Sequence, residues 1–260
     1  MVAGIPAHHG ASCCSVAFSS AYGGPGGKNY PLRRNDFALE RSMQNDAVAR
    51  IFQPFEALVQ ELIPHVIATD DGAHDIGHIG RVLANAMRIQ AVEGGDGEIL
   101  AAAVLLHDCV SVEKNSPLRA QASRLAAEKA SEILSGLGWD QGRTAACAHA
   151  IAAHSFSAGI APETLEAKIL QDADRLDAIG MIGVARLYYI GGRMGSSLYD
   201  PVDPKAEHRP LDDKMFAMDH FAAKLFKLAD GFQTATGSLL AGERHKRLHL
   251  FYDLLLEEIG

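Results

Sequence analysis

The sequence has few cysteines, and their arrangement is not typical of a disulfide framework or a structural zinc site. No C-x-x-C pair occurs, and the 260 residues contain only four cysteines: Cys13, Cys14, Cys109 and Cys147. The last two lie in Ala/Leu-rich helical patterns. Such sparse cysteine usage is typical of a reducing compartment, so we expect a cytoplasmic protein.

Long apolar runs and basic clusters are also missing. No hydrophobic stretch approaches the roughly 20 residues needed to cross a bilayer, so we expect no membrane partner. The formal net charge is −8 and there is no Lys/Arg-rich run, which argues against binding of a nucleic-acid duplex. With 48% hydrophobic residues, the chain can nevertheless bury one sizeable core. Small anions would have to be held by local positive groups or by a metal.

Residues 1–42 are rich in Gly, Ser, Ala and Pro without any period. Such a segment cannot bury enough apolar surface to offset its ordering entropy, so we expect a flexible N-terminal segment. It is either a tail or the product of an early start-codon assignment, and it lacks the basic start and apolar run of a signal peptide. Its "GGPGGKN" (23–29) is a linker and not a phosphate-binding loop, because Tyr22 and Asn29 replace the first Gly and the Ser/Thr of that motif.

From Met43 onward the hydrophobic period is helical, and no strand pattern of useful length occurs. We therefore expect an all-α chain with one domain over residues 43–260. A first helix covers 47–68, with a kink at Pro54. The stretch "GEILAAAVLLHDCV" (97–110) is apolar nearly all round, which is typical of a buried central helix.

The second half of the domain continues the helical pattern. Residues 161–192 predict a single helix that starts at Pro162 and ends at Gly191–Gly192. A polar loop punctuated by Gly, Ser and Pro follows over 193–212, and we expect it to be mobile, since loops longer than about 15 residues are usually functional or mobile. Two further helical patterns complete the chain.

Two histidines stand four residues apart in "GAHDIGHIGRV" (72–82), with Asp75 beside the first. The pattern is one letter from the H-E-x-x-H helix motif of zinc metalloproteases. Asp has a shorter reach than Glu as a general base, and no third ligand with protease spacing follows His78. The protease is therefore the weakest interpretation. Asp75 fits the first turn of a helix, where a carboxylate suits the macrodipole.

Two other segments carry acidic or imidazole side chains on apolar helices. His107 and Asp108 follow a run of Ala, Val and Leu, where burial is costly unless the groups are paired or bound to a cation. In "LQDADRLDAIG" (170–180), Asp174 and Asp177 share a helix face, whereas Asp172 points roughly the opposite way. Acids this dense repel one another unless positive charge lies among them; Arg175 could serve one and a metal another.

The order His, His-Asp, Asp on an all-helical chain resembles the HD superfamily of metal-dependent phosphohydrolases, especially the small bacterial hydrolases of the YpgQ/YedJ type. The resemblance runs from about residue 50 to 258 and implies a single compact helical bundle. It rests on four ordered motifs: "HDIGHIGRV" (74–82), "LLHDCV" (105–110), "DADRLDAIG" (172–180) and "HFAAKLFKL" (220–228).

The resemblance implies that one divalent metal ion is held by four side chains: His78, His107, Asp108 and Asp174. Mixed nitrogen and oxygen ligands leave its identity open among Mn, Mg, Co, Ni, Fe and Zn. The implied reaction is in-line attack of metal-activated water on a phosphoester or phosphoanhydride. The implied partner is a small phosphorylated molecule, in particular a nucleotide, with release of pyrophosphate from a nucleoside triphosphate as one form of the reaction. The chain would act as a monomer or homodimer.

Further roles follow from the same resemblance and, for the arginines, from the need of an acidic chain for local positive groups that grip phosphate. Its catalytic residues would be Asp108, Glu113, Lys114 and His154, and its substrate contacts His74, Arg81, Lys114, Arg119 and Arg175. The chain departs from the pattern at Ser111 and Val112, where relatives carry an acid, so Glu113 is the only local candidate base. The alternatives are a solvated loop for Glu113 and Lys114, ordinary surface arginines, and simple packing for His74.

Two other functions stay open. Some HD proteins hold two irons and act as oxygenases, and His154 with His74 could supply the extra ligands that this chemistry needs. A non-catalytic protein that binds nucleotides is the third possibility, although the complete set of ligand-type residues argues against it.

Overall fold

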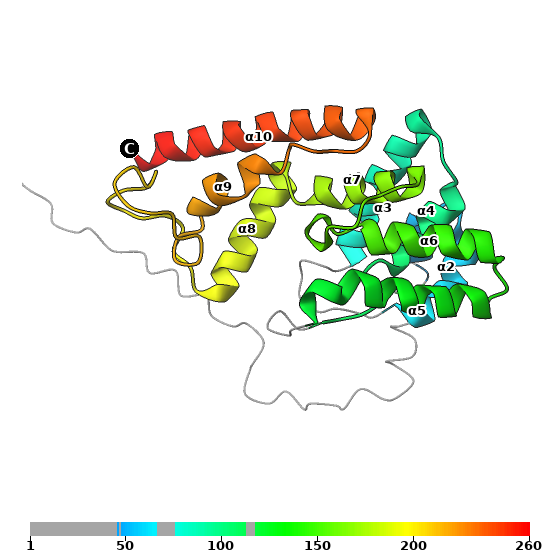
Figure 1. Ribbon diagram of the computed structural model, residues 1–260. Helices are drawn as coiled ribbons and strands as arrows, with labels where there is room; N and C mark the ends of the chain where they lie inside the picture. Colours follow the sequence, from blue (N-terminus) through cyan, green and yellow to red (C-terminus); the bar gives the residue numbers. More distant parts are fainter. Residues whose placement is uncertain (1–45, 47, 67–75, 113–117) are drawn as a thin grey trace, which may run out of the picture. The chain divides into compact units, whose positions relative to one another are not determined.

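The computed structural model describes residues 46, 48–66, 76–112 and 118–260. All of them belong to Arg41–Gly260, the larger of the two units into which the chain divides; the other is Met1–Glu40. The described residues form α-helices and short 3₁₀ turns, with one isolated β-bridge between Ser197 and Phe216 (Figure 1). The prediction of an all-α domain is confirmed. The predicted boundary after residue 42 lies outside the described residues.

The bounds of the helices are α2 (Glu56–Leu62), α3 (Ile76–Glu93), α4 (Gly97–Leu106), α5 (Ala122–Gly136), α6 (Gln141–Ala153), α7 (Leu165–Asp177), α8 (Gly180–Met194), α9 (Asp219–Ala223) and α10 (Ala235–Ile259). The longest fully described connection between two helices is the loop between α8 and α9. Short 3₁₀ turns extend α2 over Ile63–His65 and follow α9 over Leu225–Lys227. Within the described residues, no helix is both long enough and apolar enough to span a bilayer.

Four helices begin at a side chain that accepts hydrogen bonds from the first turn. Asp96 does so for α4, Asp140 for α6, Thr164 for α7 and Thr234 for α10. Such caps satisfy main-chain N–H groups that have no partner inside the helix, and each typically stabilises a helix by about 1 kcal/mol. The starts of these helices are therefore fixed by local chemistry.

Helix α4 lies at the centre of the core, as its uniform apolarity predicts. Every residue from Ile99 to Leu106 is buried, and the helix packs against α2, α3, α6 and α7. Its last residue is followed by His107, which is also buried. The central helix therefore delivers an imidazole to the interior, at the point where α3 and α7 pack against each other.

The single helix predicted over 161–192 is wrong, because the chain breaks it into α7 and α8. Helix α7 ends at Asp177, and α8 starts at Gly180, which has a φ of 71°. This left-handed conformation is accessible to glycine at little cost and interrupts the helical path. The break lets α8 leave in a new direction and pack against α10 (Figure 1).

The loop between α8 and α9 contains a dense set of polar contacts. The guanidinium of Arg209 forms ion pairs with the carboxylates of Asp200 and the buried Asp219, at N–O distances of 2.9 and 2.5 Å. Asp203 accepts hydrogen bonds from the main-chain N–H groups of Glu207 and His208. These contacts give the loop a defined path. The mobility expected of residues 193–212 stays a prediction.

Candidate metal centre

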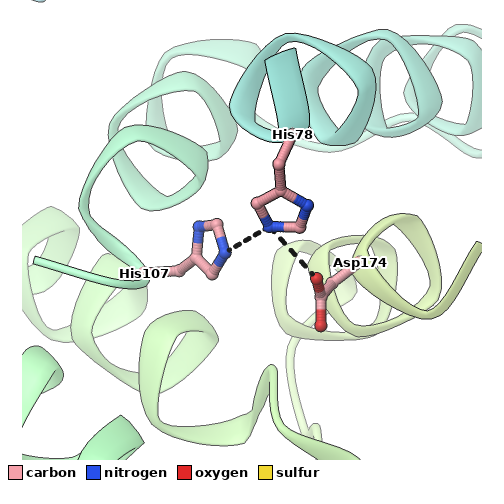
Figure 2. A group of neighbouring side chains, drawn as sticks. All are labelled: His78, His107 and Asp174. Carbon is pink, nitrogen blue, oxygen red and sulfur yellow. Dashed lines mark hydrogen bonds and ion pairs between the residues drawn. The ribbon is translucent and has the colours of Figure 1, made fainter. Parts of the chain in front are cut away.

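Three helices bring ligand-type atoms together at one end of α4. Figure 2 shows His78 of α3 reaching between His107, which follows α4, and Asp174 of α7. The Nε2 atom of His78 lies 3.3 Å from Nε2 of His107 and 3.6 Å from Oδ1 of Asp174. Oδ2 of Asp108 lies 3.5 Å from Nε2 of His107. The structure therefore brings ligand atoms of three of the four predicted metal-binding residues, His78, His107 and Asp174, within 4.8 Å of one another. The fourth, Asp108, lies beside His107.

The spacing of these atoms suits a single ion. Two ligand atoms that each lie about 2.1 Å from an ion are about 3.0 Å apart at a right angle and about 3.4 Å apart at a tetrahedral angle. The two Nε2 atoms, at 3.3 Å, fall within that range, and the two carboxylate contacts, at 3.5 and 3.6 Å, lie just above it. Both imidazoles are buried, whereas the side chains of Asp174 and Asp108 are 28% and 47% exposed. The histidines thus form the floor of the centre and the carboxylates its solvent side.

The protonation of the histidine rings also suits metal binding. Nδ1 of His107 lies 2.7 Å from the carbonyl oxygen of Val104, and Nδ1 of His154 lies 2.6 Å from that of Ile151. A carbonyl oxygen can only accept, so each Nδ1 carries a proton. In a neutral ring, Nε2 then holds a lone pair, which is the form that binds metals.

His154 joins a second group of ligand-type atoms that overlaps the first. Nε2 or Nδ1 atoms and carboxylate oxygens of His107, Asp108 and His154 lie within 4.8 Å of one another. The rings of His107 and His154 meet edge to face, with centroids 4.9 Å apart. His154 therefore lies beside His107 and Asp108, two of the four predicted metal ligands.

The pKa values of these two rings move in opposite directions. Burial opposes a charge on His107, but the carboxylates of Asp108 and Asp174 outweigh it and raise the pKa of His107 above its usual value. Burial and the neighbouring His107 together lower the pKa of His154. A proton entering the metal-free centre therefore favours His107, and a metal ion would have to displace it.

A residue to which the sequence analysis gave no role lies directly behind His78. The carboxylate of Asp177 is buried and accepts a hydrogen bond from Nδ1 of His78, at 2.8 Å. It also accepts from Nε and Nη2 of Arg81, at 2.6 and 3.1 Å, and from Nη1 of Arg186, at 2.9 Å. Burial raises the pKa of Asp177, but the hydrogen bonds from His78 and Arg81 outweigh it and hold the pKa well below its usual value. The sequence offered one sign of this contact, because helical periodicity places Asp177 on the same face as Asp174.

Two of the predicted substrate-binding arginines have structural partners. Arg81 forms the ion pair with Asp177 just described, and its side chain is 36% exposed. Arg175 is buried, and its guanidinium lies 4.3 Å from the ring centre of Phe156 and 4.7 Å from that of Phe232. It donates hydrogen bonds to the main-chain oxygens of Leu228, Asp230 and Gly231. These contacts fasten the segment before α10 to α7. The predicted role of Arg175 in substrate binding stays a prediction.

The remaining predicted residues cannot be placed. His74, Asp75, Glu113 and Lys114 lie outside the described residues, and so does the side chain of Arg119. Their roles stay predictions.

Comparisons with known proteins agree on one family. Residues 74–179 match the family model of the HD domain. The uncharacterized protein YpgQ of Bacillus subtilis is 30% identical over 205 residues, which cover 77% of this chain and 92% of that protein.

Solved structures give the same result. An HD-superfamily hydrolase from Bacillus thuringiensis has 28% identity and a TM-score of 0.58, over 84% of this chain and 97% of its own. The crystal structure of Bacillus subtilis YpgQ in complex with ADP has 30% identity and a TM-score of 0.58, over 83% and 98% of the two chains.

Proposed function

The chain belongs to the HD-domain family, and from that premise we propose that it is a metal-dependent phosphohydrolase. The observation that carries the proposal is the meeting of two buried imidazoles, 3.3 Å apart at their Nε2 atoms, with the carboxylate of Asp174, and the position of Asp108 beside His107. The proposed ligands of a divalent ion are His78, His107, Asp108 and Asp174. Mixed imidazole and carboxylate ligands suit Mn, Mg, Co, Ni, Fe or Zn.

A bound divalent ion supplies Lewis acidity toward a phosphoryl oxygen and lowers the pKa of a water molecule. The chain's own groups hold the ion and handle protons. Asp108 and Asp174 bring negative charge to the solvent side of the centre, while the buried rings exclude water from its inner side. His154 has a lowered pKa and is therefore neutral near pH 7. We propose that its Nε2 accepts a proton during the reaction and returns it to the leaving group.

A nucleotide is the substrate that we favour. This choice is supported by the crystal structure of the relative YpgQ, which is a complex with ADP. A nucleotide phosphate needs cationic contacts, which this acidic chain has to supply locally. We propose that Lys114, Arg119, His74, Arg175 and the exposed part of Arg81 contact the phosphates. Glu113, the predicted base, is the alternative to His154 as the proton acceptor.

A panel of nucleotides and phosphoesters, tested against each of the six metals with products identified by mass, would test this function. We expect metal-dependent release of phosphate or pyrophosphate. Asp108→Ala should abolish turnover while the helical circular dichroism spectrum is kept, because Asp108 is half exposed and packs in no core. Absence of turnover from every combination, in protein shown to carry metal, would refute the proposal.

A di-iron oxygenase is the second candidate, favoured by one observation. The group formed by His107, Asp108 and His154 overlaps the group formed by His78, His107 and Asp174 at a single residue, His107. Two overlapping groups could hold two ions. Metal analysis and oxygen consumption separate the candidates: one ion per chain without oxygen uptake excludes the oxygenase. Nucleotide binding without any product, in metal-loaded protein, would instead indicate a binding protein.

A further inference from the structure

The buried carboxylate of Asp177 receives hydrogen bonds from three side chains on two other helices. His78 and Arg81 come from α3, and Arg186 comes from α8. A buried charge costs several kcal/mol unless strong partners compensate it. Two guanidinium groups within 3.1 Å provide that compensation, so Asp177 is ionised in the folded protein.

An ionised carboxylate accepts hydrogen bonds and cannot donate them. Nδ1 of His78 must therefore carry the proton in its 2.8 Å contact with Asp177. The lone pair of the neutral ring is then on Nε2, the atom that lies 3.3 Å from His107 and 3.6 Å from Asp174. The ring is thus fixed in the tautomer and the orientation that a metal ligand needs.

The hydrogen-bond partner of Nδ1 in His78 differs from those in His107 and His154. The Nδ1 partners of His107 and His154 are carbonyl oxygens only three residues earlier in the chain, so those rings are oriented by the backbone around them. The partner of His78 lies 99 residues away on α7, the helix that also carries Asp174. One imidazole of α3 therefore meets two carboxylates of α7, one at each ring nitrogen.

We propose that Asp177 is a positioning residue that orients His78 for metal binding and increases its basicity, and that Arg81 and Arg186 keep Asp177 ionised. The inference rests on the proposed metal centre. A carboxylate behind a metal-binding histidine typically contributes 10–100-fold to metal affinity. The competing explanation is an ion-pair cluster that only joins α3, α7 and α8.

The chain offers a matched control on the same helix. Asp172 is also buried, but its carboxylate accepts hydrogen bonds from Gln233 and Thr234 at the start of α10. Asp172→Asn thus removes a buried charge from α7 at a place that does not contact His78. The control variant therefore shows how far the loss of a buried carboxylate on α7 alone changes metal affinity, while the contacts of His78 are kept.

The experiment compares metal-free wild type, Asp177→Asn and Asp172→Asn by calorimetric titration with Mn, Co and Ni. We expect affinity to fall about 10–100-fold in Asp177→Asn and to change by less than about twofold in Asp172→Asn. An equal loss in both variants, or no loss in Asp177→Asn, overturns the proposal. The measurement needs no turnover. A wild type that binds metal but hydrolyses nothing refutes only the proposed function, and active enzyme whose Asp177→Asn variant keeps its affinity refutes only the positioning role.

A second measurement needs no variant, in case Asp177→Asn does not fold. Nitrogen NMR of the histidine rings in the metal-free wild type reports which nitrogen of His78 carries the proton. We expect it on Nδ1 at a pH where the ring is neutral. A proton on Nε2 contradicts the proposal.

Discussion

Metal binding should raise the melting temperature of the wild-type chain and leave that of Asp108→Ala unchanged. A ligand that binds only the native state stabilises it by about 2.7 kcal/mol when its concentration is 100 times Kd. For a domain of 150–250 residues, 1 kcal/mol moves Tm by about 2–4 °C, so the expected shift is about 5–11 °C. The side chain of Asp108 is 47% exposed, so its removal should change the metal-free free energy of unfolding by no more than about 0.5 kcal/mol.

The assay is thermal denaturation followed by far-UV circular dichroism, after treatment with a chelator and with each metal added in turn. Asp253→Ala is the control, because Asp253 is another exposed carboxylate, on α10, and should keep the full shift. A shift of the same size in Asp108→Ala would show that the metal binds elsewhere. If none of the six metals moves the melting temperature of the wild type, the proposed centre does not bind an ion tightly in the folded protein.

Two substitutions test buried polar groups that lie outside the proposed centre. Asp172→Ala leaves buried N–H and O–H donors at the start of α10 without their acceptor, and each such group costs about 1–3 kcal/mol. We expect urea denaturation to show a loss of about 2–6 kcal/mol from the two fully buried donors of Thr234; a loss below about 0.5 kcal/mol would mean that water replaces the carboxylate. Tyr188→Phe should leave the free energy of unfolding unchanged or raise it by about 1 kcal/mol, because the buried hydroxyl of Tyr188 has no hydrogen-bond partner among the described residues and burial raises its pKa to about 12. A destabilised Tyr188→Phe would reveal a partner for that hydroxyl.

The burial of the central helix could be predicted because its signal is local, whereas the four proposed ligand positions came from the family resemblance. An apolar run that ends in His107–Asp108 fixes both the burial of α4 and the type of chemistry at its end. The break between α7 and α8 was missed for a physical reason. Apolar residues continue through it at helical spacing, and a single glycine such as Gly180 is tolerated inside a helix at a cost of about 1 kcal/mol, so the sequence does not reveal its left-handed conformation.

The partner of His78 could not be predicted, because it depends on how α3 packs on α7. Periodicity places Asp174 and Asp177 on one face, but it does not say which helix that face meets. The same limit applies to Arg175 and Arg81, whose charge suggested phosphate binding. Their observed partners are main-chain oxygens of the segment before α10 and the carboxylate of Asp177. A charged group on an apolar helix signals a partner without revealing whether that partner is a ligand or the protein itself.

The three acids of "DADRLD" show why acid density alone overstates a metal site. At about 100° per residue, Asp172 and Asp174 are about 200° apart and Asp177 returns close to Asp174. Asp172 accordingly accepts hydrogen bonds from the start of α10, Asp174 approaches Nε2 of His78, and Asp177 holds Nδ1 of the same ring. Two of the three charges are therefore satisfied by N–H and O–H donors of the protein. Of the three, only Asp174 faces a ring nitrogen that carries a lone pair. A carboxylate oxygen and a lone pair repel each other, and a cation between them would turn that repulsion into attraction.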